Sequence, residues 1–531
     1  MLRKIGVLGV AAATLALAAC GGTNSPTGAV ASITNRGTLV NNPAFRVASL
    51  NAVDFTAQLG ASTSGQQLLQ LAGTPACGVD FYYLKYWTVG PDNSAQEASG
   101  ALMVPTGSSA PCTGPRPIVL YAHGTTTDSA YNIADISDSS NSANSEAAMV
   151  AAVFAAQGYI VVAPNYLGYD ISTLGYHPYV DGAADAIDMM DALTAARTAL
   201  LSTFTPGTSD AGKLYVTGYS EGGYVAMATV KAMQAAGQTV TASAPSSGPY
   251  ALEAFGDSIF FGQVNIGSTV FAPLVSTSYQ HAYSNVYAQT SDVYTSTYAT
   301  GIDTLLPSTT PLARLFQNNK LPQAALFDIK TPLSTTGNTA VDAAADALLA
   351  LPSSPPYPAS LAALFDSGFG ASFLVNDAYR VGYVDDAVIH QDQAAMTLVS
   401  GGTLTSSNVG LAPTPAVGLR RDLATNDMRS GGWFPMEPML LCGGDQDPTV
   451  FFQNTQIMAA QWTPYVAGGL VSVLDLNAAP GGPFAALQGG FQATYAQLVA
   501  SQGATAAIQA YHPTEAPFCM VAARGFFAQV P

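Results

Sequence analysis

The chain has 531 residues, of which 10% are charged, and its 34 acidic and 17 basic residues give a formal net charge of -17. Lys and Arg form no cluster, so this composition argues against nucleic-acid binding, and the net acidity disfavours capture of anionic substrates or anionic lipid surfaces. Neutral substrates are favoured. Beyond the amino-terminal run, no stretch reaches the length of apolar sequence that a membrane-spanning helix needs.

The amino-terminal segment has the pattern of an export signal. Arg3 and Lys4 precede a run of apolar or small residues over positions 5–19, which ends at Cys20. Residues 17–20, Leu-Ala-Ala-Cys, resemble the lipobox of bacterial lipoproteins. That resemblance implies cleavage of a lipoprotein signal peptide at residues 1–19, lipidation of Cys20 and anchoring at the outer membrane or cell surface. Ordinary secretion, or release into the periplasm, is the alternative.

The next segments predict a tether followed by an α/β core. Residues 20–47 are rich in Gly, Ser, Thr and Asn and predict a flexible tether. Residues 48–250 predict the first part of the core and residues 435–531 the second. Strands are expected at residues 81–89, 97–104, 117–121, 159–164, 214–217, 239–244, 439–442 and 470–476, and helices at residues 145–157, 182–201 and 224–234. Strands that alternate with helices predict a mostly parallel central sheet with helices on both faces.

Residues 251–434 predict an inserted, mainly helical cap. The segment has helical patterns of its own and proline-rich breaks. An insertion after a strand of such a sheet lies beside the crevice where ligands bind. Five tyrosines of the cap recur at spacings that would put them on one face of a helix: Tyr279, Tyr283, Tyr287, Tyr294 and Tyr298. Packing inside the cap is the simpler explanation, and an aromatic wall for an apolar substrate is the alternative.

The most informative motif is Gly218-Tyr219-Ser220-Glu221-Gly222. It follows an apolar strand-like run and precedes a helix-like run. A strand, a tight turn and a helix are the context of a nucleophile elbow, in which glycines allow the sharp turn that exposes the serine hydroxyl. Ser220 is therefore the predicted nucleophile. A glycine-rich turn without catalytic function is the alternative, because the motif alone is short.

An acyl-transfer serine needs a histidine base held by a carboxylate. In hydrolases with this type of elbow the chain order is serine, acid, histidine. His512 follows the late strands and is the predicted base. Asp445 and Asp447, in the loop after residues 439–442, compete as the acid.

The remaining parts of the expected site are an oxyanion hole and two disulfides. The oxyanion hole should use the backbone N–H of the residue after the nucleophile, Glu221, and one from the loop after the early strand, for which Thr125 is the candidate. Cysteines other than Cys20 number four, and three pairings are possible in an exported protein. The preferred pairs are Cys77–Cys112, which flank the early hairpin, and Cys442–Cys519. The second pair would join the acid loop to the histidine segment. No Cys or His spacing indicates a metal site.

With these residues placed, the chain resembles the α/β-hydrolase superfamily, most closely the secretory lipase family of the fungal lipase-A type and its bacterial esterase relatives. The matching pieces are His123-Gly124-Thr125, residues 164–169, His177-Pro178-Tyr179, residues 218–223, residues 247–250 and the Asp447 and His512 segments. Gly444, Asp447 and Val450 also match the G-x-x-D-x-x-V pattern common in α/β-hydrolases, which favours Asp447 over Asp445.

The resemblance implies hydrolysis of neutral, apolar carboxylic esters through an acyl-enzyme, with no metal or organic cofactor. The expected partners are an ester or lipid substrate and a membrane surface reached through Cys20. An exported serine peptidase of the same fold is one alternative. A surface lipoprotein that kept the fold but only binds a ligand is the other.

Overall fold

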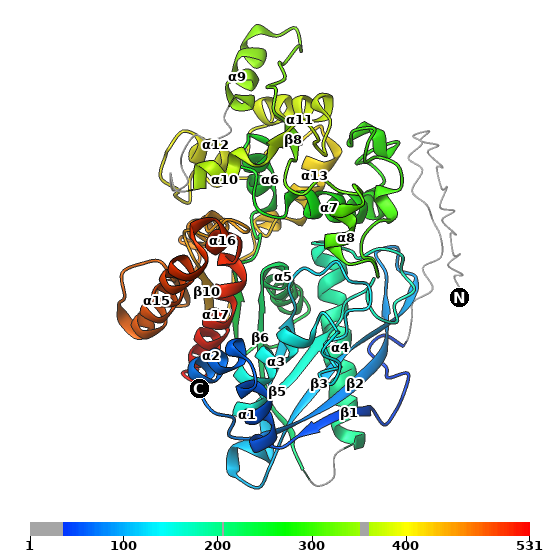
Figure 1. The fold of residues 1–531 in the computed structure, drawn as a ribbon, viewed down its shortest axis with the longest axis vertical. Coiled ribbons are helices and arrows are strands. Elements are labelled where there is room, and N and C mark those ends of the chain that lie inside the picture. The colour runs from blue at the N-terminus through cyan, green and yellow to red at the C-terminus, as the bar shows by residue number, and fades with distance from the viewer. Residues whose placement is uncertain (1–34, 204–206, 351–360, 531) are drawn as a thin grey trace, which may run out of the picture. The chain divides into compact units, whose positions relative to one another are not determined.

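The computed structural model describes residues 35–203, 207–350 and 361–530. Within these residues the central sheet has nine strands in the order β1-β2-β3-β5-β4-β6-β7-β10-β11 (Figure 1). Their bounds are β1 (Phe45–Leu50), β2 (Gly78–Val89), β3 (Ala95–Thr106), β4 (Pro115–Ala122), β5 (Ile160–Pro164), β6 (Ser209–Tyr219), β7 (Ala242–Ser246), β10 (Met439–Gly443) and β11 (Val471–Asp475).

Most of this sheet is parallel. Strands β5, β4, β6, β7, β10 and β11 pair in parallel, whereas β1, β2 and β3 form an antiparallel meander whose last strand joins β5 antiparallel. Three of the parallel strands, β5, β7 and β10, are five residues long and buried along their whole length, as strands covered on both faces are. The predicted mostly parallel sheet is confirmed.

The topology places one end of the sheet at a switch point. The chain runs from β4 to β5 on one side and then returns to β6 on the other side, so β4 lies between strands that follow it in sequence. Ala122 at the end of β4 is paired with Gly218 at the end of β6. Ligands of open α/β sheets bind beyond the carboxyl ends of strands at such a point. The loops after Ala122 and Gly218 therefore lie next to each other where a site is expected.

Helices cover both faces of the sheet. On β6, alternate side chains point to opposite faces. Thr217 contacts Met520 of helix α17, whereas a Cβ on Gly218 would lie 2.2 Å from the carbonyl oxygen of Gly222 in helix α5. Helix α4 packs on α5 over one face, and α17 packs with α2 and α3 over the other (Figure 1). The bounds of the core helices are α1 (Ala52–Gly60), α2 (Thr63–Ala72), α3 (Asn144–Val153), α4 (Gly182–Thr203), α5 (Glu221–Ala235), α14 (Gln453–Trp462), α15 (Ala485–Gln502), α16 (Ala504–Gln509) and α17 (Tyr511–Phe527).

A mainly helical cap connects β7 to β10, as expected, and Figure 1 shows its helices gathered at one end of the sheet. Its elements are α6 (Leu252–Phe260), α7 (Ser268–Tyr283), α8 (Leu312–Gln317), β8 (Phe327–Asp328), α9 (Thr339–Leu349), α10 (Ala362–Asp366), β9 (Phe369–Gly370), α11 (Asp377–Ile389), α12 (Gln393–Val399) and α13 (Gly418–Asn426). Buried ion pairs join these helices. The Arg420 guanidinium lies 2.8 Å from Asp257 and 3.3 Å from Asp386, which joins α13 to α6 and α11.

The predicted single helix through the five cap tyrosines is wrong. Helix α7 ends at Tyr283, because Ser284 adopts a left-handed conformation with φ of 54° and turns the chain away. Tyr279 donates to the carbonyl oxygen of Val180, so it packs the cap onto the core. Of the five tyrosines, Tyr294 lines the pocket described below. The aromatic wall, which was the alternative to packing inside the cap, is therefore not formed by this set.

The tether expected over residues 20–47 differs from the structure at its carboxyl end. The amide of Val40 donates to Lys85 of β2, Arg36 forms an ion pair with Asp191, and β1 begins at Phe45. The expected signal peptide and Cys20 lie outside the described residues and stay predictions. In the described part of the chain, no helix combines the length and apolar character needed to cross a bilayer.

Candidate active site

The predicted nucleophile lies on a strained turn between β6 and α5. Ser220 has φ of 62° and ψ of -127°, a conformation that L-residues rarely adopt. The backbone is tightly packed here, since a Cβ on Gly222 would lie 2.0 Å from the carbonyl oxygen of Ala122. Only glycine fits that position. The result is a hydroxyl that stands above the sheet at the carboxyl end of β6, which is the geometry of a nucleophile elbow.

The structure brings His512 and Asp447 together. The Nδ1 of His512, in the first turn of α17, lies 2.6 Å from the Oδ2 of Asp447. The other carboxylate oxygen of Asp447 accepts the amides of Thr449 at 2.8 Å and Val450 at 3.2 Å. These amide donors stabilise the anion and fix the orientation of the carboxylate. Asp445 is exposed and takes no part in this contact.

The second nitrogen of His512 is not used by the contact with Asp447. Among the described residues, the buried Nε2 has no hydrogen-bond partner. The imidazole packs on Tyr219, the residue before Ser220, with ring centroids 4.8 Å apart. The single hydroxyl hydrogen of Tyr219 is shared between the carbonyl oxygen of His512 at 2.6 Å and Oε1 of Glu515 at 2.8 Å. Because Nδ1 donates to Asp447, Nε2 is left as the basic lone pair. This is the tautomer that a general base for a serine hydroxyl requires.

Both predicted oxyanion donors belong to segments that lie next to Ser220. Glu221 is the first residue of α5, so its amide has no intrahelical acceptor. The loop after β4 passes so close that a Cβ on Gly124 would lie 3.6 Å from the Cβ of Ser220. The amide of Gly124 is already bound to Glu146 at 3.1 Å, which leaves the amide of Thr125 as the next donor of that loop.

A buried histidine holds the side chain of Glu221. His177 Nε2 lies 2.6 Å from Glu221 Oε1, and both side chains are fully buried. The other ring nitrogen of His177 contacts the carbonyl oxygen of Leu167 at 2.8 Å. This pair anchors the residue whose amide is the predicted oxyanion donor. The role was missed from the sequence, although His177 belongs to one of the pieces that resemble the family.

His123 is structural. It is fully buried, its ring nitrogens lie 2.8 Å from the carbonyl of Gly124 and 3.1 Å from that of Asn165, and it stacks on Tyr131 and Tyr166. These contacts hold the loop after β4 in place. His123 therefore positions the backbone of the oxyanion loop and has no free nitrogen for proton transfer.

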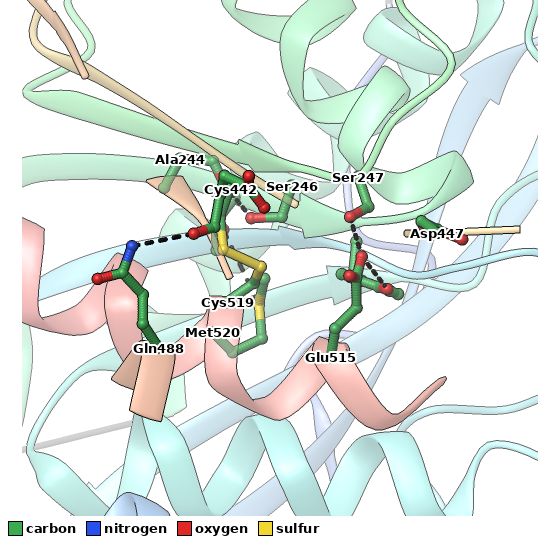
Figure 2. Close-up of a disulfide and its surroundings, with 12 residues drawn as sticks. Ala244, Ser246, Ser247, Cys442, Asp447, Gln488, Glu515, Cys519 and Met520 are labelled. Carbon is green, nitrogen blue, oxygen red and sulfur yellow. Dashed lines mark hydrogen bonds between the residues drawn. A yellow bond between two sulfur atoms is a disulfide. The ribbon is translucent and has the colours of Figure 1, made fainter. Parts of the chain in front are cut away.

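Both preferred disulfides are confirmed. Cys77 and Cys112 are bonded beside β2, and Cys442 and Cys519 are bonded between β10 and α17. Figure 2 shows the second bridge next to Ser246, with Asp447 and Glu515 nearby. It joins the strand that precedes the Asp447 loop to the helix that carries His512, and the two Cα atoms lie 5.6 Å apart. The bridge thus limits separation of the acid from the base.

Glu515 is a second buried carboxyl at the site that the sequence did not single out. It lies one turn after His512 on α17, is fully buried, and accepts a hydrogen bond from the Tyr219 hydroxyl at 2.8 Å. Burial and the neighbouring Asp447 raise the pKa of Glu515 well above its ordinary value. One carboxyl oxygen of Asp447, one of Glu515 and a ring nitrogen of His512 lie within 4.8 Å of one another. The sequence signal that could have found Glu515 was its spacing from His512 along the helix.

An apolar pocket opens beside Ser220, between the core and the cap. Its volume, as the space open to the centres of water-sized molecules, is about 110 Å³. The walls come from the cap helices α6, α7 and α13, together with residues of the acid loop and of the segment before α4. Lining residues include Val180, Leu252, Phe255, Ile259, Phe260, Phe271, Val275, Leu419 and Val450. Such a wall offers apolar surface to a substrate and few hydrogen bonds.

Comparison with known proteins agrees with this geometry. The model of the prolyl oligopeptidase family matches residues 145–286, which include Ser220. The rice cell wall degrading esterase LipA from Xanthomonas oryzae is 24% identical, with a TM-score of 0.63 over 92% of this chain and 98% of that chain. Its ligand-bound form is 25% identical, with a TM-score of 0.62 over the same shares. A protein of Legionella pneumophila described as a hydrolase is 19% identical, with a TM-score of 0.60 over 93% and 98%. No curated protein sequence matches significantly.

The fold is that of the α/β-hydrolases, and the comparisons support an enzyme of the α/β-hydrolase type. The strained serine turn agrees with this class. The predicted fold and the resemblance to α/β-hydrolases are confirmed.

Proposed function

We propose that the protein is a serine carboxylic-ester hydrolase that acts on neutral, apolar esters. The observation that carries the proposal is the position of Ser220 on a strained elbow at an apolar pocket, with the Asp447–His512 pair packed against the preceding residue. The pocket would take the apolar part of the substrate and direct its carbonyl toward Ser220. The net negative charge of the chain and the apolar pocket fit an uncharged ester better than an anionic one.

The reaction would follow the acyl-enzyme route. The Oγ of Ser220 attacks the ester carbonyl while Nε2 of His512 takes its proton, and Asp447 stabilises the imidazolium. The amides of Thr125 and Glu221 stabilise the oxyanion of the tetrahedral intermediate. His512 then protonates the leaving alcohol, and the acyl group stays on Ser220. Water, deprotonated by His512, releases the carboxylic acid and restores the serine hydroxyl.

The first test is hydrolysis of p-nitrophenyl esters over short to long acyl chains, with purified mature protein and Ser220→Ala in parallel. We expect the variant to lose at least about 10⁴-fold in kcat, because removal of a triad member leaves only binding and oxyanion stabilisation. A fluorophosphonate probe should label Ser220 in the wild type. Equal thermal unfolding of both proteins is the control for folding. Ester hydrolysis retained by Ser220→Ala would refute the proposal.

An exported serine peptidase is the second candidate, because the prolyl oligopeptidase family model covers the elbow. The match spans the serine turn that esterases and peptidases share, so it leaves the substrate open. The acidic side chain at the pocket, Glu221, is held by His177, whereas a peptidase subsite needs a carboxylate that can bind a substrate amino terminus. Aminoacyl anilides assayed beside the esters separate the two. Failure of both substrate classes and of the probe would favour a binding protein.

Export and lipidation at Cys20 remain part of the proposal. They are supported by the leader pattern of residues 1–20 and by the two disulfides, which an oxidising compartment allows. A mass measurement of the amino-terminal peptide from membranes would detect the lipid. An unmodified peptide in the soluble fraction would instead indicate secretion.

A further inference from the structure

Glu515 makes contacts that a carboxyl group with a purely structural role does not need. Its Oε1 accepts hydrogen bonds from two hydroxyls, that of Tyr219 at 2.8 Å and that of Ser247. Figure 2 shows the side chain rising from α17 toward Ser247, with Asp447 alongside. Tyr219 precedes the nucleophile and Ser247 follows β7. One carboxyl therefore links the histidine helix to two strand ends of the site.

The second carboxyl oxygen of Glu515 accepts no hydrogen bond from the described residues. Among the described residues, Oε2 is buried without a hydrogen-bond partner. The carboxyl oxygens of Glu515 and Asp447 and a ring nitrogen of His512 lie within 4.8 Å of one another. The backbone of Gly444 closes the space beside Oε2 of Glu515, since a Cβ on Gly444 would lie 2.8 Å from that oxygen. Two carboxylates so close in a buried site do not both ionise near neutral pH.

The contacts show which carboxyl keeps the charge. Both oxygens of Asp447 accept N–H hydrogen bonds, from Thr449, Val450 and His512. These hydrogen bonds stabilise the Asp447 anion. Glu515 receives hydroxyl donors on Oε1 alone, and a hydrogen on Oε2 would turn that unsatisfied acceptor into a donor. Burial raises the pKa of Glu515 well above its ordinary value, in agreement with this assignment.

We propose that Glu515 is a neutral carboxylic acid at working pH and a positioning residue of the site, with its Oε2–H directed at Asp447. This inference rests on the proposed serine esterase function. The neutral acid holds the Asp447 carboxylate in place without adding a negative charge. A charged Glu515 about 5 Å from the imidazole would favour imidazolium and move the acid limb of the pH–rate profile up by roughly two pH units at an effective dielectric constant of about 20.

The titratable groups that interact with Glu515 are Tyr219 from β6, Tyr250 after β7, Asp447 from the loop after β10, and Tyr511 and His512 from α17. Asp445 and Asp475 act on Tyr511. The tyrosines and acids add no positive charge that would ionise Glu515, since burial raises the pKa of Tyr219 and Tyr511 as well. His512 carries the positive charge only when protonated, and Asp447 already neutralises that charge.

The test compares Glu515→Gln and Glu515→Leu with the wild type. Glutamine keeps an acceptor for Tyr219 and Ser247 and an N–H donor for Asp447, whereas leucine has neither. We expect Glu515→Leu to lose at least about tenfold in kcat with little change in KM, and Glu515→Gln to recover most of that loss. The acid limb of the Glu515→Gln profile should coincide with that of the wild type. A limb that falls by roughly two pH units in Glu515→Gln, or an unchanged kcat in Glu515→Leu, would overturn the inference.

A second readout does not depend on activity. Infrared difference spectra of wild type minus Glu515→Gln at pH 7 should contain the carbonyl stretch of a protonated carboxyl. A carboxylate band in its place would overturn the inference even if the leucine variant fails to fold. Because this band is measured without substrate, a protein that hydrolyses no ester but shows the protonated band would refute the esterase proposal and leave the protonation of Glu515 supported.

Discussion

Replacement of Asp447 by asparagine tests the assignment of the catalytic acid directly. In the structure, Oδ1 of Asp447 accepts the amides of Thr449 and Val450, and Oδ2 accepts Nδ1–H of His512. An asparagine in this place keeps its carbonyl oxygen toward the two amides, which need an acceptor. Its NH₂ group must then face His512. The imidazole would respond by keeping the lone pair on Nδ1 and the proton on Nε2, which is the tautomer that cannot deprotonate Ser220.

The expected loss in kcat is about 10⁴-fold, which corresponds to about 5 kcal/mol in the activation free energy. The geometry supports a loss of this size because Asp447 is 2% exposed, so no water replaces the missing acceptor. The assay is p-nitrophenyl ester hydrolysis with kcat and KM determined separately. The KM should change little, since Asp447 does not face the pocket. Thermal unfolding should show that the variant is folded.

Asp445→Asn is the matched control, two residues away in the same loop. Asp445 is exposed, and its carboxylate contacts the side chain of its neighbour Gln446 at 3.1 Å. We expect its kcat to stay within about twofold of the wild type, as for a surface charge. A large loss in Asp445→Asn together with near-normal activity in Asp447→Asn would refute the reasoning and would reverse the assignment of the acid.

Two further predictions concern the frame around the site. Replacing both Cys442 and Cys519 by serine should lower the free energy of unfolding by about 4 kcal/mol for a 77-residue separation, and it should also lower kcat because the bridge joins the acid strand to the histidine helix. The Cys77–Cys112 bridge lies away from these residues, so its loss should reduce stability and leave kcat nearly unchanged. Burial raises the pKa of Asp188 to about 7, so its contribution to stability is lost as pH rises from about 4 to about 7. Asp188→Asn should match the wild type near pH 4 in thermal unfolding and be more stable at pH 8, by at most about 4 kcal/mol, and equal stability at pH 8 would contradict this.

Local sequence was sufficient for the elements with strong periodicity or strong turn chemistry. Apolar runs such as residues 159–164 and the glycines around Ser220 have few alternative structures, because continuous apolar strands need burial and Gly222 tolerates no Cβ. The strand β1 was missed, since residues 45–50 are half-exposed edge residues with little alternation. The helix predicted through the cap tyrosines was wrong for a different reason. Their spacing is helical, but a left-handed Ser284 ends the helix at Tyr283, and a serine at that position carries no strong stop signal.

The sequence by itself determined the class of the protein and the identity of the predicted triad, because Ser220, Asp447 and His512 follow strand ends in an order that the fold requires. Only the tertiary structure decided what surrounds them. His177 meets Glu221 from 44 positions away, and Tyr219 meets Glu515 from 296 positions away. Such contacts depend on how helices pack across the sheet, and no periodicity along the chain encodes them. Burial then decides the protonation of these side chains, since a carboxyl such as Glu515 keeps its proton only where water and cations are excluded.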